Sequence, residues 1–269
     1  MAETVGPYRL SNARGPDGLP RAANPDGEPV ALVRLDPRAD AARLDRARAL
    51  ASLRHPSLRA ILAVGEADGA AWIALEDLPG ETLAQRLERG PLPIWEVTRL
   101  ASQLASALGA LHANGVLHLA LDPTRVLLCA PHRASLTPLD PTGAGPAPGY
   151  APPERDASPA ADVYGLGALL YACLTAHAPT QPLAPPSRTN RQTPRWLDAL
   201  ILRCLAEDPR ERPRDPSAVQ RTLTLHERAH PHPLPVARRP RRLLLLGLLA
   251  TLAAVALLWR AGAFAALGR

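Results

Sequence analysis

The stretch that decides the fold of this chain is Gly115-Val116-Leu117-His118-Leu119-Ala120-Leu121-Asp122-Pro123-Thr124-Arg125-Val126-Leu127-Leu128. It follows residues 94–113, in which apolar side chains recur every three or four positions, the pattern of a helix with one face on a core. Two apolar runs flank a turn at Asp122-Pro123, so we expect a short strand, a tight turn and a second strand. The rest of the chain is expected to pack around this unit.

The composition favours a folded domain with an aliphatic core. Apolar residues make up 46% of the 269 residues, but aromatic residues only 3%. The formal charge is +6, and all 31 basic residues are Arg. Residues 229–269 hold six of these Arg and no acid, which leaves 25 Arg against 25 acids in residues 1–228. The part expected to fold is therefore neutral and lacks the basic face typical of nucleic-acid-binding domains, so we predict no nucleic acid partner.

The cysteines and the N-terminus indicate the compartment. Cys129, Cys173 and Cys204 are odd in number, far apart and each within an apolar run. This pattern predicts buried free thiols in a reducing compartment, and it does not have the spacing of a metal site. Residues 1–10 lack the apolar core of a signal peptide, so none is expected.

Upstream of the central stretch, the pattern changes from strands to helices. Residues 8–35 predict a small antiparallel sheet with a turn at 24–27 and an apolar strand at 29–35. Residues 40–53 have helical spacing, and residues 71–78 predict another strand. Thr82 is a suitable N-cap for a helix through Leu87.

Downstream, helices predominate. Residues 162–171 are so apolar that we expect a helix at the centre of the domain, and residues 196–205 predict a further helix. Gly115 is expected to end the helix that precedes the central stretch.

These segments together resemble the bacterial eukaryotic-like Ser/Thr protein kinases. Residues 115–128 are similar to the family's catalytic loop, H-R-D-L-K-P-x-N, and residues 76–83 to its hinge. Residues 149–154, 162–171 and 207–213 resemble its Y-x-A-P-E, D-V-Y-S-L-G and D-P-x-x-R-P motifs. The resemblance covers about residues 5–228. It implies an α+β, two-lobed protein-kinase-like fold, with a β-rich N-lobe over 1–78 and a mainly helical C-lobe over 79–228.

The residues that would perform catalysis are replaced. In this family, phosphoryl transfer needs a Lys–Glu pair, an Asp and an Asn that hold Mg²⁺, and an Asp that orients the acceptor hydroxyl. The matching positions carry Val33, Arg46, Ala120, Arg125 and Pro138. We therefore expect no catalytic residues and no metal site.

The expected nucleotide site is also degenerate. The family's glycine-rich loop is represented by Gly15 and Gly18, and the intervening Pro16 has no N–H to offer a phosphate. The resemblance assigns the hinge to Glu76, Asp77 and Leu78. We predict no cofactor, with ATP and Mg²⁺ binding lost or weak.

The residues that hold the fold together are present. His118 and Asp162 match positions that tie the catalytic loop to the central helix in the family. Glu154 and Arg212 match its buried ion pair, in which loss of one partner is strongly destabilising. All four are expected to be structural.

The C-terminal segment predicts a membrane anchor. Residues 243–259 are 17 apolar residues with only Gly247 and Thr251 as mild exceptions, and a helix over 243–267 would cross a ~30 Å hydrocarbon core. Four Arg in the linker 229–242 precede it. The positive-inside rule then predicts a single-pass protein of the cell membrane with a cytoplasmic kinase-like domain.

Three functional hypotheses follow. The first is a membrane-anchored pseudokinase that acts as a signalling scaffold or regulator without phosphoryl transfer. Its expected partners are an unidentified protein at the inner face of the membrane and the lipid bilayer, which it binds through residues 243–267. The second is an unconventional Ser/Thr kinase with a rearranged nucleotide site that uses Asp122 or Asp140. The third is a metal-free ATP-binding sensor. The main prediction is the first, a non-enzyme.

Overall fold

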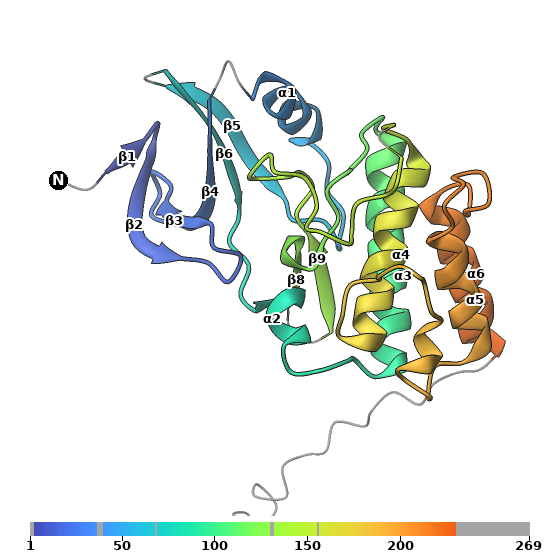
Figure 1. Cartoon of the computed structure of the whole chain (residues 1–269). Coiled ribbons are helices and arrows are strands. Elements are labelled where there is room, and N and C mark those ends of the chain that lie inside the picture. Colours follow the sequence, from blue (N-terminus) through green and yellow to red (C-terminus); the bar gives the residue numbers. More distant parts are fainter. Residues whose placement is uncertain (1–2, 37–39, 68, 130–131, 155, 230–269) are drawn as a thin grey trace, which may run out of the picture. The chain divides into compact units, whose positions relative to one another are not determined.

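The computed structural model describes residues 3–36, 40–67, 69–129, 132–154 and 156–229 (Figure 1). The predicted membrane helix at 243–267, and nearly all of the linker 229–242, lie outside the described residues. Within the described part, no helix is both long and apolar enough to cross a bilayer.

The N-terminal part is an antiparallel sheet with one helix beside it (Figure 1). The sheet has the order β1-β2-β3-β4-β6-β5. Its strands are β1 (Thr4–Val5), β2 (Tyr8–Arg14), β3 (Pro20–Ala23), β4 (Pro29–Leu35), β5 (Ile61–Ala67) and β6 (Ala70–Glu76), and the helix α1 (Ala41–Leu50) lies between β4 and β5 in the chain.

Strand β4 is buried on both faces because its two sets of alternate side chains enter different clusters. Val30 and Leu32 join a small cluster around Trp72, whose ring meets that of Tyr8 edge to face with the centroids 4.9 Å apart. Ala31, Val33 and Leu35 face the main core, together with Leu44 and Ala47 of α1. The continuous apolar run in the sequence therefore reflects a strand covered on each side.

The C-terminal part is mainly helical (Figure 1). Its helices are α2 (Leu83–Leu87), α3 (Ile94–Ala113), α4 (Pro159–Thr175), α5 (Arg195–Cys204) and α6 (Pro216–Ala229), with 3₁₀ turns η1 (Pro123–Arg125) and η2 (Pro186–Arg188). The strands β7 (Glu81–Thr82), β8 (Val126–Cys129) and β9 (Arg133–Leu136) form a small antiparallel sheet.

Helix α4 is the centre of this part, as its apolar sequence predicts. It begins at Ser158, whose side chain accepts a hydrogen bond from the N–H of Ala161. Gly167 allows α5 to approach, because a Cβ at this position would lie 2.6 Å from Cβ of Cys204. The prediction for Thr82 also agrees with the structure: Thr82 and Gln85 form a reciprocal capping box at the start of α2.

The two-lobed kinase-like fold is confirmed, but one local prediction is wrong. Only the second of the two strands expected in the central stretch forms, at Val126–Cys129, and the turn is the 3₁₀ turn η1. Residues 117–121 are irregular because the N–H groups of His118 and Leu119 donate to the carboxylate of Asp162 and not to a neighbouring strand.

Candidate functional site

The central loop is shaped by one buried carboxylate. Asp162 of α4 accepts hydrogen bonds from the N–H of His118 at 2.8 Å and of Leu119 at 2.7 Å, and Nε2 of His112 lies 2.7 Å from the same carboxylate. Leu119 has a φ of 59°, a conformation that costs a non-glycine residue energy. The two bonds from the loop N–H groups hold the loop in this shape against that strain, and the contact of His112 ties the same carboxylate to α3.

His118 joins the loop to the segment that follows β9. Its side chain is buried, Nε2 lies 2.8 Å from the carbonyl oxygen of Thr137, and Nδ1 faces the N–H of Ala120. Burial lowers the pKa of His118, although the charge of Asp162 opposes this effect. The neutral ring therefore donates from Nε2 to Thr137 and accepts at Nδ1.

Three of the positions that the resemblance assigns to catalysis carry buried side chains that cannot hold a charge. Val33 packs in the main core, and Ala120 and Pro138 are buried. Arg46 is half-buried on α1 and has no ion pair with a described residue, and its neighbour Asp45 pairs with Arg48. A Lys–Glu pair is therefore replaced by an aliphatic side chain and a lone cation.

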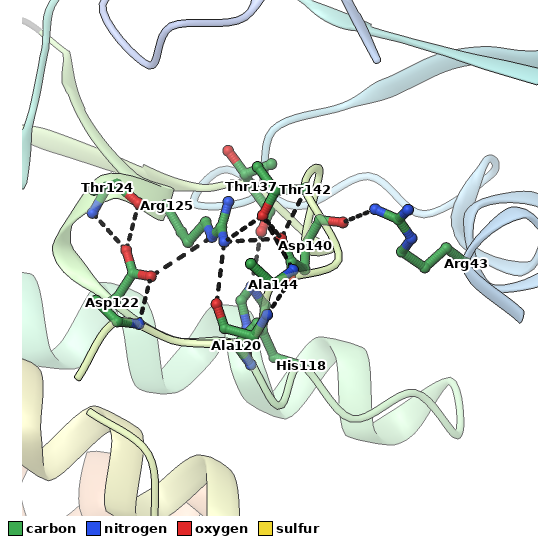
Figure 2. A network of polar contacts seen from close by, with 12 residues as sticks. Arg43, His118, Ala120, Asp122, Thr124, Arg125, Thr137, Asp140, Thr142 and Ala144 are labelled. Carbon is green, nitrogen blue, oxygen red and sulfur yellow. Dashed lines mark hydrogen bonds and ion pairs between the residues drawn. The ribbon is translucent and has the colours of Figure 1, made fainter. Parts of the chain in front are cut away.

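Arg125 lies between two carboxylates (Figure 2). Its Nη2 is 2.8 Å from Oδ1 of Asp140, and its Nε is 3.8 Å from Oδ2 of Asp122. The side chains are 9%, 11% and 3% exposed for Arg125, Asp140 and Asp122, so the three charges are shielded from water. The site holds one fixed cation and two acids, with a net charge of −1.

Each acid is also fixed by backbone donors. Asp122 accepts from the N–H and hydroxyl of Thr124 and from the N–H of Ala147. Asp140 accepts from the N–H and hydroxyl of Thr142 and from the N–H of Gly145 (Figure 2). These bonds, with the ion pair between Arg125 and Asp140, hold the central loop against residues 140–147.

The electrostatics of Asp140 favour its charged form. Burial by itself raises the pKa of this carboxyl, but the hydrogen bonds from Thr142 and Gly145 and the charge of Arg125 outweigh burial and bring the pKa below its ordinary value. Helix α1 also reaches this segment, because Nη1 of Arg43 donates to the carbonyl oxygen of Asp140 at 3.3 Å (Figure 2). Asp140 is thus held in its charged form and in a fixed position.

The candidate nucleotide residues are brought together by side chains of the chain itself. The loop that contains Gly15 and Gly18 meets the hinge through Asp17, which pairs with the buried Arg59. Nε of Arg59 in turn donates to the carbonyl oxygen of Glu76 at 2.7 Å.

Two further contacts lie nearby, one from β3 to the hinge and one from α2 to the glycine loop. Arg21 pairs with Asp77, and Nε2 of Gln85 donates to the carbonyl oxygen of Pro16 at 3.2 Å. Leu78 is buried beside Leu127 and Cys129. The glycine loop therefore lies against the hinge.

Glu154 and Arg212 form a bidentate ion pair, with Nη1–Oε1 at 2.6 Å and Nη2–Oε2 at 2.7 Å. The Arg212 side chain is 0% exposed and also donates to the carbonyl oxygens of Ala206 and Ala160. Its guanidinium carbon is 4.9 Å from the centre of the Tyr164 ring. This pair fixes the segment before α4 to the segment after α5.

A cavity of about 300 Å³ adjoins the central loop. It is lined by Leu119 and Leu121 from the loop, by Pro146 and Tyr150, and by residues around the start of α4, namely Ala151, Pro152, Glu154, Asp156, Ala157, Ala161, Asp162 and Gly165. Asp122 lies next to this lining, between Leu121 and the N–H of Ala147 that it accepts from. Asp122, Arg125 and Asp140 are not themselves among the lining residues, and Leu121 is the lining residue that precedes Asp122 in the chain.

Sequence reasoning missed Arg59, Asp17 and Arg43 as parts of the site. A signal for Arg59 existed, because it is the one charged residue in the otherwise apolar run Leu58–Leu62. For Asp17 and Arg43 no such signal existed, because each lies in a polar stretch of the sequence. Asp17 is 42 residues from Arg59, and Arg43 is 97 residues from Asp140.

No model of a protein family matches the chain. The curated relatives are bacterial Ser/Thr protein kinases. The chain is 32% identical to serine/threonine-protein kinase pkn3 of Myxococcus xanthus over an alignment of 229 residues, and the match covers 68% of this chain and 41% of the relative. It is 30% identical to PknH of Mycobacterium bovis over an alignment of 212 residues, and this match covers 67% of this chain and 35% of the relative. It thus spans less than half the length of each.

Solved structures with the same fold include a kinase domain. The PknI kinase domain of Mycobacterium tuberculosis has a TM-score of 0.70 and 25% identity, with 83% of this chain and 98% of that chain covered. Rad53 in complex with AMP-PNP has a TM-score of 0.70 at 20% identity, with 81% of this chain and 65% of that chain covered. At this identity, the likeness to Rad53 shows the fold alone.

These comparisons overturn the prediction that the chain is not an enzyme. Proteins about 30% identical to it are named as Ser/Thr protein kinases, and its structural neighbours are kinase domains. The prediction rested on five replaced residues, Val33, Arg46, Ala120, Arg125 and Pro138, and it ranked the second hypothesis, a kinase that uses Asp122 or Asp140, below the scaffold. The relatives point to a kinase.

Proposed function

We propose that the chain is a Ser/Thr-kinase-type phosphotransferase with a rearranged nucleotide site. Its homologues are bacterial Ser/Thr protein kinases, and it has a kinase-like fold. The observation that carries the proposal is the position of Arg125 between the carboxylates of Asp122 and Asp140. A fixed cation beside fixed acids supports the proposal, because phosphoryl transfer depends on the positioning of the reactants and on the stabilisation of charge.

The proposed reaction uses residues of this group in two roles. An acceptor hydroxyl attacks the γ-phosphorus of a nucleoside triphosphate, the bond to the bridging oxygen breaks, and the nucleoside diphosphate leaves. Asp122 orients the hydroxyl and accepts its proton. The guanidinium of Arg125 faces the negative charge of the transferred group, to which it can donate in a planar, bidentate way. Asp140 keeps Arg125 in place through its 2.8 Å contact.

Magnesium does not fit the residues that stand at the family's metal positions. Pro138 has no side-chain atom that binds a metal, and Arg125 is itself a cation that repels one. The two remaining acids are already paired with the charge of Arg125 and accept from backbone N–H groups. No step of the proposed reaction is therefore routed through a metal ion, and Arg125 supplies the positive charge.

The acceptor is proposed to be a Ser or Thr of a protein segment that enters the cavity of about 300 Å³ beside the central loop. Leu119, Leu121 and Pro146 give this cavity an apolar wall next to Asp122. A short side chain that carries a hydroxyl would reach the Asp122 carboxylate from this side.

A second candidate function is an ATP-binding sensor without turnover. It is favoured by the hydrogen bonds of Asp122, since both of its carboxylate oxygens already accept from Thr124 and Ala147. A base that is fully engaged in the resting structure would bind no substrate proton. Nucleotide in the cleft would then change only the conformation of the loops around it.

The test is phosphate transfer by the full 269-residue chain with γ-labelled ATP and GTP, in Mg²⁺ and in EDTA. We expect label on Ser or Thr in both conditions. Asp122→Asn should lower the rate by about 10²–10⁴-fold, the usual contribution of a general base. Asp26→Asn, in an exposed turn, is the matched control. If the wild type transfers no label with either nucleotide, the phosphotransferase is refuted, and a nucleotide-dependent rise in melting temperature would then favour the sensor.

The proposed place of action is the inner face of the cell membrane, with residues 243–267 as a single-pass anchor and a protein partner as the phosphate acceptor. The apolar run 243–259 and the Arg-rich linker before it support this proposal. Membrane fractionation of the tagged chain, with and without residues 243–267, tests the anchor. Recovery of the full chain in the soluble fraction would refute it.

A further inference from the structure

Another cavity, of about 240 Å³, is lined by residues of α2, α3 and the small sheet of β7, β8 and β9. Its charged lining residues are Glu81, Arg86, Arg89, Glu96, Arg99 and Arg133. It shares no lining residue with the cavity beside the central loop, and Asp122, Arg125 and Asp140 do not line it. The proposed phosphotransfer therefore gives this cavity no role.

The charge of this lining differs from that of the folded part as a whole. Residues 1–228 hold equal numbers of Arg and of acids, 25 of each. The lining holds four Arg against two Glu, which is a net charge of +2 with His132 neutral. A hollow with an excess of one charge focuses the electric field, and it attracts ligands of the opposite charge more strongly than a convex surface does.

Only part of this positive charge is neutralised within the chain. Arg89 and Glu81 form a bidentate ion pair, with both N–O distances at 2.6 Å. Arg86 donates to a backbone carbonyl oxygen 3.1 Å away, which leaves its positive charge in place. Arg99 and Arg133 are exposed, and neither side chain has a hydrogen bond or ion pair with a described residue. The cavity thus has guanidinium donors that the described fold does not use.

Gln103 fixes the elements that carry the two unpaired guanidinium groups. Its Oε1 accepts from the N–H of Ala134 at 2.7 Å, and its Nε2 donates to the carbonyl oxygen of His132 at 3.1 Å. These two residues flank Arg133 in the chain, and Gln103 lies one turn after Arg99 on the same face of α3. The backbone positions of both Arg are therefore set by the fold before any ligand binds.

We propose that this cavity binds the phosphate group of a phosphorylated Ser or Thr side chain in a protein segment. A phosphomonoester carries a charge of about −1.5 to −2 at neutral pH and three acceptor oxygens, which suits a lining with a net charge of +2 and several guanidinium donors. The buried side chains of Leu92, Leu100 and Ala134 give the lining an apolar part for the carbon atoms beside the phosphate.

The size and the charge of the cavity favour this ligand over others. A volume of about 240 Å³ is below the range of about 300–1,000 Å³ for sites of drug-sized ligands, so it suits one side chain better than a nucleotide. An Asp or Glu side chain brings only one negative charge and leaves part of the positive charge of the cavity unpaired. A flat bilayer of anionic lipids would meet the exposed Arg99 and Arg133 but not the buried apolar part of the lining.

The test is calorimetric titration of the full 269-residue chain, without nucleotide, with the capped peptide Ala-Leu-phosphoserine-Leu-Ala. The unphosphorylated peptide and the peptide with Asp in place of phosphoserine are titrated in parallel. We expect the phosphopeptide to bind at least about 10-fold more tightly than the Asp peptide, because the dianion accepts additional charge-assisted hydrogen bonds.

Substitutions in the lining should change this affinity in both directions. Arg99→Gln and Arg133→Gln should each weaken binding of the phosphopeptide about 10-fold, the usual effect of one lost hydrogen bond to a charged group. Glu96→Gln should tighten it about 3-fold, because it removes a like charge beside the phosphate. The matched controls Arg191→Gln and Arg214→Gln change exposed Arg of the same lobe that do not line the cavity, and both should bind as the wild type does.

The four Arg substitutions leave the fold intact, because these side chains are exposed and have no described partner. The inference is overturned if the wild type does not bind the phosphopeptide, or binds the Asp peptide as tightly. It is also overturned if Arg99→Gln and Arg133→Gln bind the phosphopeptide as the two controls do. Each of these results leaves the proposed phosphotransfer standing, because that reaction is assayed separately and uses other residues.

A titration with lipid vesicles tests the membrane as the alternative ligand. The full chain is mixed with vesicles of phosphatidylcholine alone and of phosphatidylcholine with phosphatidylserine. If Arg99→Gln abolishes a preference for the anionic vesicles and no peptide binds, the cavity belongs to lipid head groups and the proposal is refuted. If the preference is the same in the wild type and in Arg99→Gln while the phosphopeptide distinguishes them, the assignment to a phosphorylated side chain is supported.

Discussion

Replacement of Glu154 by Gln tests how much the buried ion pair with Arg212 contributes to stability. Arg212 is 0% exposed in its side chain and Glu154 16% exposed. Removal of one partner of a fully buried pair is destabilising by about 3–5 kcal/mol. Arg212 keeps the carbonyl oxygens of Ala206 and Ala160 as acceptors at 2.8 and 3.0 Å, and Glu154 is partly hydrated, so we expect a loss of about 2–3 kcal/mol.

The assay is thermal unfolding of the full chain. For a domain of this size, about 2–4 °C is lost per kcal/mol, so Glu154→Gln should melt about 4–12 °C below the wild type. The matched control is Glu211→Gln, at an exposed position near the same segment. A decrease of less than about 1 °C in Glu154→Gln would show that the carbonyl acceptors satisfy Arg212 by themselves, which would refute the reasoning.

The same pair predicts a pH dependence. The hydrogen bond from Arg212 holds the pKa of the Glu154 carboxyl below its ordinary value. A carboxyl whose pKa is lower in the folded state stabilises the fold above its unfolded pKa, and this contribution is lost as the pH falls through the folded pKa. The wild type should therefore lose part of its advantage over Glu154→Gln between neutral and acidic pH. An unchanged difference in melting temperature across this range would contradict the assignment.

Two further substitutions test the local geometry. Gly80→Ala should destabilise the chain by at least about 2 kcal/mol, measured by denaturant unfolding, because Gly80 has a φ of 133° and a Cβ there would lie 2.1 Å from the carbonyl oxygen of Leu128. The control is Gly90→Ala, where φ is 101° but a Cβ would meet no atom, so the difference between the two variants gives the cost of the clash. Asp162→Asn should destabilise the folded chain by about 2–3 kcal/mol. It should also speed hydrogen exchange at the N–H groups of His118 and Leu119, which donate to the Asp162 carboxylate. Unchanged exchange at both amides would contradict the role of Asp162.

The sequence by itself determined the architecture, because architecture depends on patterns that repeat along the chain. The spacing in 94–113 and the apolar run at 162–171 identified the helices α3 and α4, and the run at 29–35 identified β4. Capping at Thr82 followed from residue type alone. In each case the signal is local: a helix or strand that must bury one side shows this in its own residues.

The chemistry of the site was decided only by the tertiary structure. The resemblance indicated which residues were lost, Val33 and Ala120 among them, but the contacts that shape the site join residues that are far apart in the chain. Arg59 meets Asp17 across 42 residues, and Arg43 meets the carbonyl oxygen of Asp140 across 97. An isolated Arg or Asp in a sequence has no partner until packing supplies one, because the contact arises from the approach of separate elements and leaves no periodic pattern.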